Sequence, residues 1–573
     1  MYIETVPNRN SKPTILLRES WRDGKKTRKR TLANLTNWPE ETIMQFRALL
    51  KGTKMAPVTE IYSTKHSLPS GHVDAILGTI GKLGLENLIA AKPCRERDLV
   101  LAMLVERLIH PCSKLATTRL WHTTTLAEQL RVQDASENEL YAALDWLLKR
   151  QHRIENKLAH KHLKQGSVVL YDVSSSSYEG RTCPLARWGK NRDGKKLPCI
   201  VYGILADDQG RPVAVDVYPG NTGDPSTVPD QVEKLRKRFE LSRVVLVGDR
   251  GMLTQIQIGK LKEHPGLGWI SALRSSAIRK LMEQSTLQMS LFDEKNLAEI
   301  SSPDYPGERL VACYNPFLAE DRRRTREQLL QAAEKKLGKI AAQVARRTKT
   351  PMTADLIGIK VGKALKQHKM GKHFILRIED GIFEYKRNHN SIEREKKLDG
   401  IYVIRTSEPV EQMSAQDTVR NYKNLSQVEL AFRCLKGVDL RLRPIFLRSE
   451  NHVRAHVFLC TLAYYIQWHM RKALAPILFE DEELETLRRK RDPVAKAKPS
   501  RSVKVKKTAK TTPDGLVVHS FDTLLDNLAT RTRNYCRVNS AECPVDFVQH
   551  TDLTPLQARA FQLLGLDLKN CTQ

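Results

Sequence analysis

The chain has 573 residues, whereas a typical domain has roughly 100 to 200, so the length predicts several domains. Its 95 Lys and Arg residues outnumber 65 Asp and Glu, giving a formal net charge of +30 and a pI near 9.7. This imbalance attracts polyanions, so nucleic acid is the first expected partner and a membrane surface the second. The most apolar segment, 455–468, contains His456 and is too short to span a bilayer, which indicates a buried core helix.

The N-terminus and the cysteines indicate the cellular compartment. The opening residues, MYIETVPNRNSK, lack the apolar stretch of a secretory signal, so we expect a cytoplasmic protein. Ten cysteines are scattered without any CxxC pair. This spacing argues against a zinc knuckle and a disulfide framework and favours reduced thiols.

The first two predicted domains are a small basic α+β module and a helical domain. In residues 1–55, RDGK is typical of a hairpin turn between short strands, and Pro39 lies in the first turn of a following helix. Apolar residues then recur at intervals of three and four from 71 to 163. We therefore expect a helical domain over 56–165.

A change of period at Gly166 marks the start of a predicted α/β sheet over 166–275. An apolar run ends in Asp172, and a hairpin with the turn DDQG follows over 199–221. A helical stretch, the run VVLV before Asp249 and another strand complete the segment. The order strand, hairpin, helix, strand, strand predicts a sheet of mixed direction.

Three further segments are expected in the remaining chain. They are an α+β insertion over 276–410, the last part of the core over 411–475, where the composition is again typical of a core, and a basic linker and C-terminal region over 476–573. The charged helix at 318–348 fits a coiled-coil arm or an exposed single helix. Residues 488–510 hold eleven basic residues against one acid, which is typical of a flexible tail or linker.

Two acids stand after apolar strands. Functional groups gather at the carboxyl ends of strands in open α/β sheets, so Asp172 and Asp249 would converge if their strands were parallel neighbours. Sequence alone leaves that adjacency open. An Asp in this position is also an ordinary residue of a strand-ending turn.

A third acid, Glu429, lies in a helix predicted over 415–438. The prediction rests on five apolar positions that recur at helical spacing, namely Val419, Leu425, Val428, Phe432 and Leu435. Seven-residue steps turn a helix by almost two circles, so Tyr422, Glu429 and Lys436 fall along one stripe, with Arg433 beside it. A Glu on a helix is commonly just solvated. The ordered set is more specific than any member alone.

Three carboxylates held together repel one another and take up protons unless a charge compensates them. Magnesium or manganese compensates because both prefer carboxylate oxygens, and two such ions support phosphoryl transfer. We therefore predict that Asp172, Asp249 and Glu429 hold two ions. Asp224 fits either a plain loop or a residue that reaches the site. The serines 174–177 could suggest a nucleophile, but no G-x-S-x-G motif surrounds them.

The segments LYDVSSSSYEG, GNTGDPST and VVLVGDRGML, and above all YKNLSQVELAFRCLKGVDLRLRPIFLRSENHVRAHVFLCTLAYYI, resemble the DDE transposases of bacterial insertion sequences. Specifically, they resemble the group with a Tyr-Arg-Glu-Lys signature. The similarity runs from the N-terminal hairpin to about residue 470. It implies an RNase H-like catalytic core with an insertion before the Glu, for which 276–410 is the counterpart.

The resemblance also implies roles for single residues. Asp172, Asp249 and Glu429 match the three catalytic acids, while Tyr422 and Lys436 match the first and last letters of the signature. These two residues, Arg433 and Arg250 are expected to position DNA phosphates. Where many members have the signature arginine, this chain has Leu425, and either Lys423 or Arg433 would have to supply the charge.

The implied function is a DNA transposase that binds the terminal inverted repeats of its own element, cleaves them and joins the 3′ hydroxyl ends to target DNA. Residues 1–163 are the expected site of end recognition, and a homodimer in a synaptic complex at the nucleoid is the expected assembly. Two alternatives stay open: a structure-selective nuclease that never joins, and an inactive DNA-binding regulator.

Overall fold

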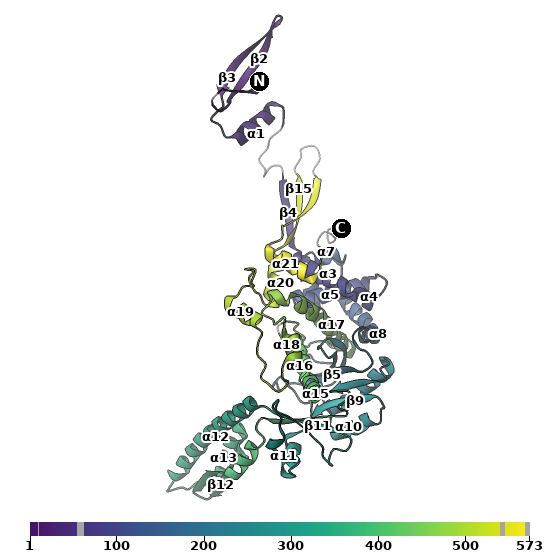
Figure 1. The fold of residues 1–573 in the computed structure, drawn as a ribbon, viewed down its shortest axis with the longest axis vertical. Helices are drawn as coiled ribbons and strands as arrows, with labels where there is room; N and C mark the ends of the chain where they lie inside the picture. Colours follow the sequence, from purple (N-terminus) through teal and green to yellow (C-terminus); the bar gives the residue numbers. More distant parts are fainter. Residues whose placement is uncertain (10, 54–61, 438, 539–544, 568–573) are drawn as a thin grey trace. The chain divides into compact units, whose positions relative to one another are not determined.

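The computed structural model describes residues 1–9, 11–53, 62–437, 439–538 and 545–567 (Figure 1). These residues form two compact units. The first comprises Met1–Leu68 and Thr532–Thr551, and the second Pro69–Arg531 and Asp552–Gln573.

Among the described residues, the first unit contains two three-stranded sheets and one helix; the pairs β1–β2, β2–β3 and β15–β16 are antiparallel. Its elements are β1 (Tyr2–Val6), β2 (Thr14–Asp23), β3 (Lys26–Asn34), α1 (Glu40–Leu50), β4 (Tyr62–Pro69), β15 (Thr532–Val538) and β16 (Val545–His550). The predicted RDGK hairpin is confirmed, because Asp23 pairs with Lys26 across the turn between β2 and β3. The expected helical domain, in contrast, starts with the strand β4. Its partner β15 lies more than 450 residues away, so local periodicity could not reveal the sheet.

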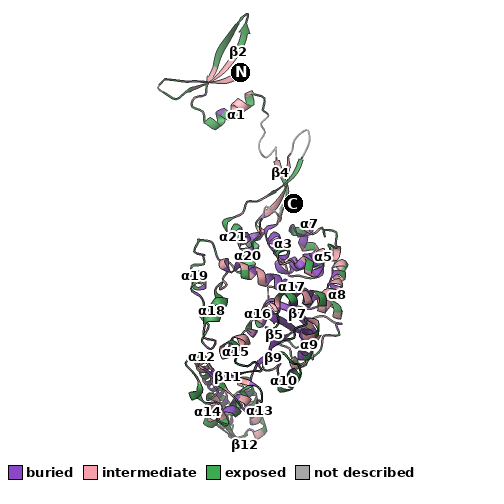
Figure 2. Ribbon diagram, turned by 45° about the vertical axis from the view of Figure 1, so that its right-hand side comes forward, coloured by how far each residue is buried: buried purple, intermediate pink, exposed green. Residues whose placement is uncertain are grey.

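The helices predicted over 71–163 are present in the second unit. They are α3 (Gly71–Leu83), α4 (Leu85–Ile89), α5 (Arg95–Ile109), α6 (Lys114–Leu120), α7 (Leu126–Gln129) and α8 (Glu137–His162). Ser136 and Glu139 form a capping box that fixes the start of α8. Both α5 and α8 pack against α17 (Glu450–Leu474), and Figure 2 shows buried residues concentrated there.

The apolar segment 455–468 is a buried core helix, as predicted. It lies inside α17, where His456 is 8% exposed and its Nε2 lies 3.3 Å from the carbonyl oxygen of Leu442. In the described part of the chain, no helix is long and apolar enough to cross a membrane. The eight cysteines that the structure describes are free thiols.

A mixed eight-stranded sheet forms the centre of the second unit, in the order β10-β11-β14-β9-β8-β5-β6-β7. Its strands are β5 (Ser167–Ser177), β6 (Cys199–Asp207), β7 (Pro212–Pro219), β8 (Val244–Val247), β9 (Leu267–Ala272), β10 (Leu297–Ile300), β11 (Arg309–Tyr314) and β14 (Ile401–Thr406). The neighbours β5, β8 and β9 are parallel, while the β6–β7 hairpin and the other pairs are antiparallel. The predicted mixed α/β sheet is thus confirmed.

Helical segments connect these strands. They are η2 (Asp224–Thr227), α9 (Val228–Glu233), a π-helical turn (Lys234–Arg238), α10 (Gln255–Lys262) and α11 (Ser275–Glu283).

Residues 276–410 are expected from the sequence to form an insertion separate from the sheet. Instead, three of their strands, β10, β11 and β14, extend the sheet beyond β9. The remainder has its own small core. It consists of α12 (Pro316–Ala345), α13 (Ala354–His368), β12 (Phe374–Glu379), β13 (Ile382–Arg387) and α14 (His389–Lys396).

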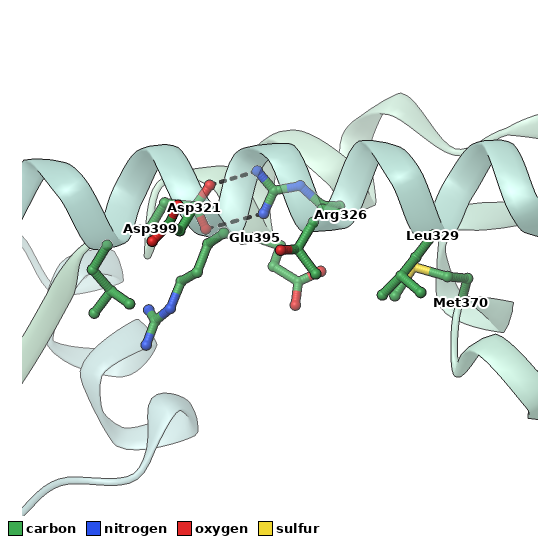
Figure 3. A pocket seen from close by; sticks show the side chains of 9 residues that line it. Asp321, Arg326, Leu329, Met370, Glu395 and Asp399 are labelled. Carbon is green, nitrogen blue, oxygen red and sulfur yellow. Dashed lines mark hydrogen bonds and ion pairs between the residues drawn. The ribbon is translucent and has the colours of Figure 1, made fainter.

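The charged helix α12 is neither a coiled-coil arm nor a single exposed helix. Leu330 and Leu337 are buried against α13 and the β12–β13 hairpin, and Arg387 of β13 binds both Glu327 and Glu334. On the same helix, Arg326 lines a pocket and donates to Asp399 at 3.0 Å (Figure 3). The described residues that line this pocket include none of the predicted site residues.

The C-terminal basic stretch is folded, in contrast to the expected flexible tail. The last helices are α18 (Leu484–Lys490), α19 (Arg501–Ala509), α20 (Phe521–Ala529) and α21 (Pro555–Leu564). The side chain of Lys506 is 2% exposed, and its Nζ donates to the carbonyls of Ala475 and Glu480 and pairs with Glu482 at 2.8 Å. Composition misled here because the cost of burying a lysine can be offset by oxygen acceptors that a count of basic residues does not reveal.

Candidate active site

The two aspartates lie on parallel neighbouring strands. Strand β5 pairs with β8 so that Leu170 lies opposite Val247. Two further residues along each chain lead to Asp172 and Asp249, so the register brings them to the same edge. The sequence predicts Asp172 at the end of its strand. The structure differs, because β5 continues past Asp172 to Ser177 along β6. It becomes accessible because β8 stops at Val247.

The carboxylate of Asp249 shapes its own turn. Its Oδ1 accepts hydrogen bonds from the backbone N–H groups of Gly251 at 2.9 Å and Met252 at 2.7 Å. This is the ordinary turn role of such an Asp. Within the described chain, its Oδ2 has no hydrogen-bond partner, which leaves one oxygen for a ligand.

Glu429 lies on a helix that packs against β5. The predicted helix 415–438 consists of α15 (Ala415–Lys423) and α16 (Leu425–Lys436), joined at Asn424, whose φ of −63° and ψ of −19° remain helical. All five predicted apolar positions are buried, namely Val419, Leu425, Val428, Phe432 and Leu435. Glu429 itself is exposed and forms no hydrogen bond or ion pair within the described residues.

The pKa of Asp172 depends on the charges of the other two acids. Burial raises this pKa to about 7, against the N–H of Val173 and the charge of Arg192, and the charges of Asp249 and Glu429 raise it further. Each of these two carboxylates therefore makes the ionisation of Asp172 harder. Both lie within electrostatic range of Asp172.

Tyr422 belongs to the same cluster. Burial raises its pKa to about 12, the charges of Asp249, Glu429 and Asp172 add to the effect, and Arg250 opposes it. The hydroxyl consequently stays protonated at neutral pH and remains a hydrogen-bond donor.

Lys436 is anchored to β5, close to Asp172 along the chain. Its Nζ donates to Ser174 Oγ at 2.7 Å and to the carbonyl of Ser175 at 2.5 Å, and lies 4.0 Å from Asp193. Burial lowers its pKa to about 8, while Asp193 opposes the shift. In this conformation the ammonium braces β5 directly after Asp172.

We expect Lys436→Met to destabilise the protein by about 1 to 3 kcal/mol, because the substitution leaves buried acceptors on β5 without a donor. Urea unfolding followed by circular dichroism measures the change. The matched control is Arg433→Met on the same helix, whose exposed side chain makes no ion pair among the described residues. Equal stabilities of the two variants would contradict the bracing role.

Sequence reasoning missed Arg192. Its guanidinium donates to the carbonyl oxygen of Val173, next to Asp172, and pairs with Asp224 at 2.8 Å. Asp224, read from sequence as a plain loop residue, is thereby linked to the site. The signal was the charged loop GKNRDGKK between β5 and β6, which carries no strand or helix period.

The structure also separates the candidates for the missing signature arginine. Leu425 is 8% exposed and part of the hydrophobic core. Lys423 donates to the carbonyl of Pro493 and lies 5.6 Å from the ring centre of Tyr402, so its charge is engaged. Arg433 and Arg250 are exposed, and neither side chain has an ion-pair partner in the described residues.

The donor set fits a hard divalent cation. Carboxylate oxygens are the ligands such an ion prefers, the pKa of Asp172 is raised to about 7 by burial with smaller contributions from the charges of Asp249 and Glu429, and Glu429 has no partner among the described residues. As the described side chains stand, no group of three or more His, Cys, Asp or Glu residues is close enough to hold a metal. The chemistry of the acids fits, and their side chains would have to close around an ion.

Comparison with known families identifies the class of protein. Residues 163–466 match the family model described as Transposase DDE domain, and the chain belongs to that family. This match spans all three acids and more than half of the chain. Residues 3–57 match the model described as IS1634 family transposase, N-terminal domain.

The protein is therefore a DDE transposase of an insertion sequence, and the resemblance seen in the sequence is confirmed. The DDE domain makes it a metal-dependent polynucleotidyl transferase or nuclease whose partner is DNA. No curated protein matches the chain.

Proposed function

We propose that the protein binds the terminal inverted repeats of its insertion sequence, cleaves them by phosphoryl transfer and joins the freed 3′ hydroxyl ends to target DNA. The observation that carries this proposal is the parallel pairing of β5 with β8, which directs Asp172 and Asp249 to one edge. The electrostatic coupling of Asp172 to Asp249 and Glu429 supports it.

In this proposal Asp172, Asp249 and Glu429 hold two Mg²⁺ or Mn²⁺ ions. Bound ions of this kind activate the attacking oxygen and stabilise the leaving oxygen of a phosphodiester. Water is the nucleophile in cleavage and the DNA hydroxyl in joining, so no covalent link between protein and DNA is needed. Asp249 is suited to the role because its turn hydrogen bonds fix the carboxylate.

The neighbouring residues position the DNA strand. The protonated hydroxyl of Tyr422 donates to a phosphate oxygen, and the exposed Arg250 and Arg433 neutralise phosphates on either side of the acids. Lys436 holds β5 in place through Ser174 and Ser175 and contributes positive charge below the acids.

The proposed core is RNase H-like. Parallel β5, β8 and β9 flanked by the antiparallel β6–β7 hairpin, with α16 across β5, support this assignment. The domains over 1–55 and 56–165 would recognise the element ends, and a homodimer would hold two ends together at the nucleoid.

The test uses the purified full-length protein, a DNA carrying both element ends, Mg²⁺ and a target plasmid. We expect cleavage at the ends and a joined product. Cleavage without joining would show a nuclease instead, and end binding without cleavage in either Mg²⁺ or Mn²⁺ would show a DNA-binding regulator.

Arg433→Ala should weaken binding of end DNA by about 3- to 10-fold and reduce the salt dependence of binding by about one phosphate contact. Arg433 lies four residues after Glu429 and has no ion-pair partner among the described residues, so its charge is available to a DNA phosphate. Titrations by fluorescence anisotropy at several salt concentrations measure both quantities. Lys423→Ala is the matched comparison, and a larger loss there would assign the phosphate contact to Lys423.

A further inference from the structure

The outer half of the β2–β3 hairpin is exposed on both faces. Every residue from 20 to 31 is exposed, including Trp21 at 45%, and Figure 2 shows the outer part of β2 as exposed. A two-stranded ribbon that packs on nothing is marginally stable in water. Packing within residues 1–55 does not explain why the β2–β3 hairpin extends so far, and this points to a binding partner.

The charge of the ribbon identifies the kind of partner. Two of its cations are neutralised, since Arg28 pairs with Asp23 at 2.7 Å and Lys29 lies 3.6 Å from Glu4. Four others have no hydrogen-bond or ion-pair partner among the described residues: Arg22, Lys25, Lys26 and Arg30. Four free cations within nine consecutive positions favour a polyanion.

The two faces of the ribbon differ. Cross-strand partners share a face, so the pairs Ser20–Lys29, Arg22–Thr27 and Arg18–Thr31 form one face without an acid on the ribbon itself. The opposite face is formed by the pairs Glu19–Arg30, Trp21–Arg28 and Asp23–Lys26. Arg, Lys, Ser and Thr are the side chains that donate to base edges and phosphates.

The tip of the ribbon is narrow. Register Asp23–Lys26 leaves a two-residue loop, and Gly24 has a φ of +63° at its first position, which glycine tolerates. Two strands lie about 4.8 Å apart, whereas the major groove of B-DNA is about 12 Å wide and admits a two-stranded ribbon.

We propose that the β2–β3 hairpin enters the major groove of DNA. The acid-free face with Ser20, Arg22 and Thr27 lies toward the base edges, and Lys25, Lys26 and Arg30 contact the flanking phosphates. This inference rests on the proposed binding of element ends and names the part of the chain that reads them. The family match of residues 3–57 establishes the module as part of the transposase but assigns it no ligand.

The first test compares two quadruple variants of the full-length protein. R22A/K25A/K26A/R30A removes the free cations of the hairpin, and R346A/R347A/K349A/K363A removes four exposed cations without ion-pair partners from the described part of the insertion. The probe is a DNA fragment spanning one flank of the coding region. We expect the hairpin variant to bind on the order of 100-fold more weakly at about 0.1 M salt, with a salt slope reduced by about 3, while the control changes little. Equal losses in both variants would overturn the inference.

The second test identifies the groove. Dimethyl sulfate methylates guanine N7, which lies in the major groove. The wild-type protein should protect guanines that Arg22→Ala leaves unprotected, whereas Lys25→Ala should lower affinity without changing the pattern. Unchanged protection by Arg22→Ala, or tighter binding of anionic vesicles than of DNA, would overturn the assignment.

The outcomes also separate this inference from the proposed function. If the hairpin variant binds and cleaves element ends like the wild type, the hairpin inference fails and the proposed function stands. If wild-type protein neither binds nor cleaves those ends, both fail. Each variant should melt at the same temperature as the wild type. This control shows whether the exposed substitutions leave the fold intact.

Discussion

Asp249→Asn should lower the rate of DNA cleavage by about 10²- to 10³-fold, the range found when a group that stabilises developing charge is removed. The amide keeps an oxygen to accept from Gly251 and Met252, so the turn survives while the charge is lost. Binding of end DNA should persist. Gel analysis of cleaved ends in Mg²⁺ and anisotropy titrations measure the two properties.

The matched control for this variant is Glu263→Gln. Glu263 is an exposed acid of the same core, after α10, and makes no ion pair among the described residues. The control removes the same charge and should cleave at the wild-type rate. A cleavage rate of Asp249→Asn within tenfold of the wild type would contradict a metal-binding role for Asp249.

Asp172→Asn should stabilise the metal-free protein at pH 8 and abolish cleavage. The folded pKa of Asp172 is about 7 against an ordinary value of 3.8, so the native state binds more protons than the unfolded state between these values. Stability therefore falls as pH rises through this window, and above pH 7 the charged form destabilises the fold. Removing the charge should restore about 1 to 3 kcal/mol at pH 8, since one pKa unit corresponds to about 1.4 kcal/mol.

Thermal melting with EDTA at pH 8 and at pH 4 measures this effect. The melting temperature of the variant should exceed that of the wild type at pH 8, and the difference should vanish near pH 4. Mg²⁺ in place of EDTA at pH 8 should stabilise the wild type more than the variant, because the ion compensates the charge of the ionised Asp172. If the variant melted at a lower temperature than the wild type at pH 8 without metal, the result would contradict the claim that the ionised Asp172 destabilises the fold.

Local patterns predicted those features of the fold that depend on nearby residues. Helical spacing gave the buried face of α15 and α16, including Val428 and Phe432, and the turn residues gave the hairpin at Gly24. An apolar run followed by Asp249 gave β8 and its tip. These signals were sufficient because each arises within one element.

Long-range pairings were not accessible in the same way. The register of Leu170 with Val247 joins segments more than 70 residues apart, and the strands β10, β11 and β14 join the sheet from within the predicted insertion. Burial of Lys506 and the contacts of Arg192 depend on acceptors elsewhere in the chain. The types of residue in the candidate site were readable from the sequence, whereas the placement of Asp172 and Asp249 at one edge depended on the register of β5 with β8.

The most direct test of the carboxylate site is an anomalous diffraction map of the protein bound to element-end DNA and Mn²⁺. We expect manganese peaks bridged by the carboxylates of Asp172, Asp249 and Glu429, beside a phosphate. Manganese bound elsewhere, with Glu429 directed away from both aspartates, would contradict the account.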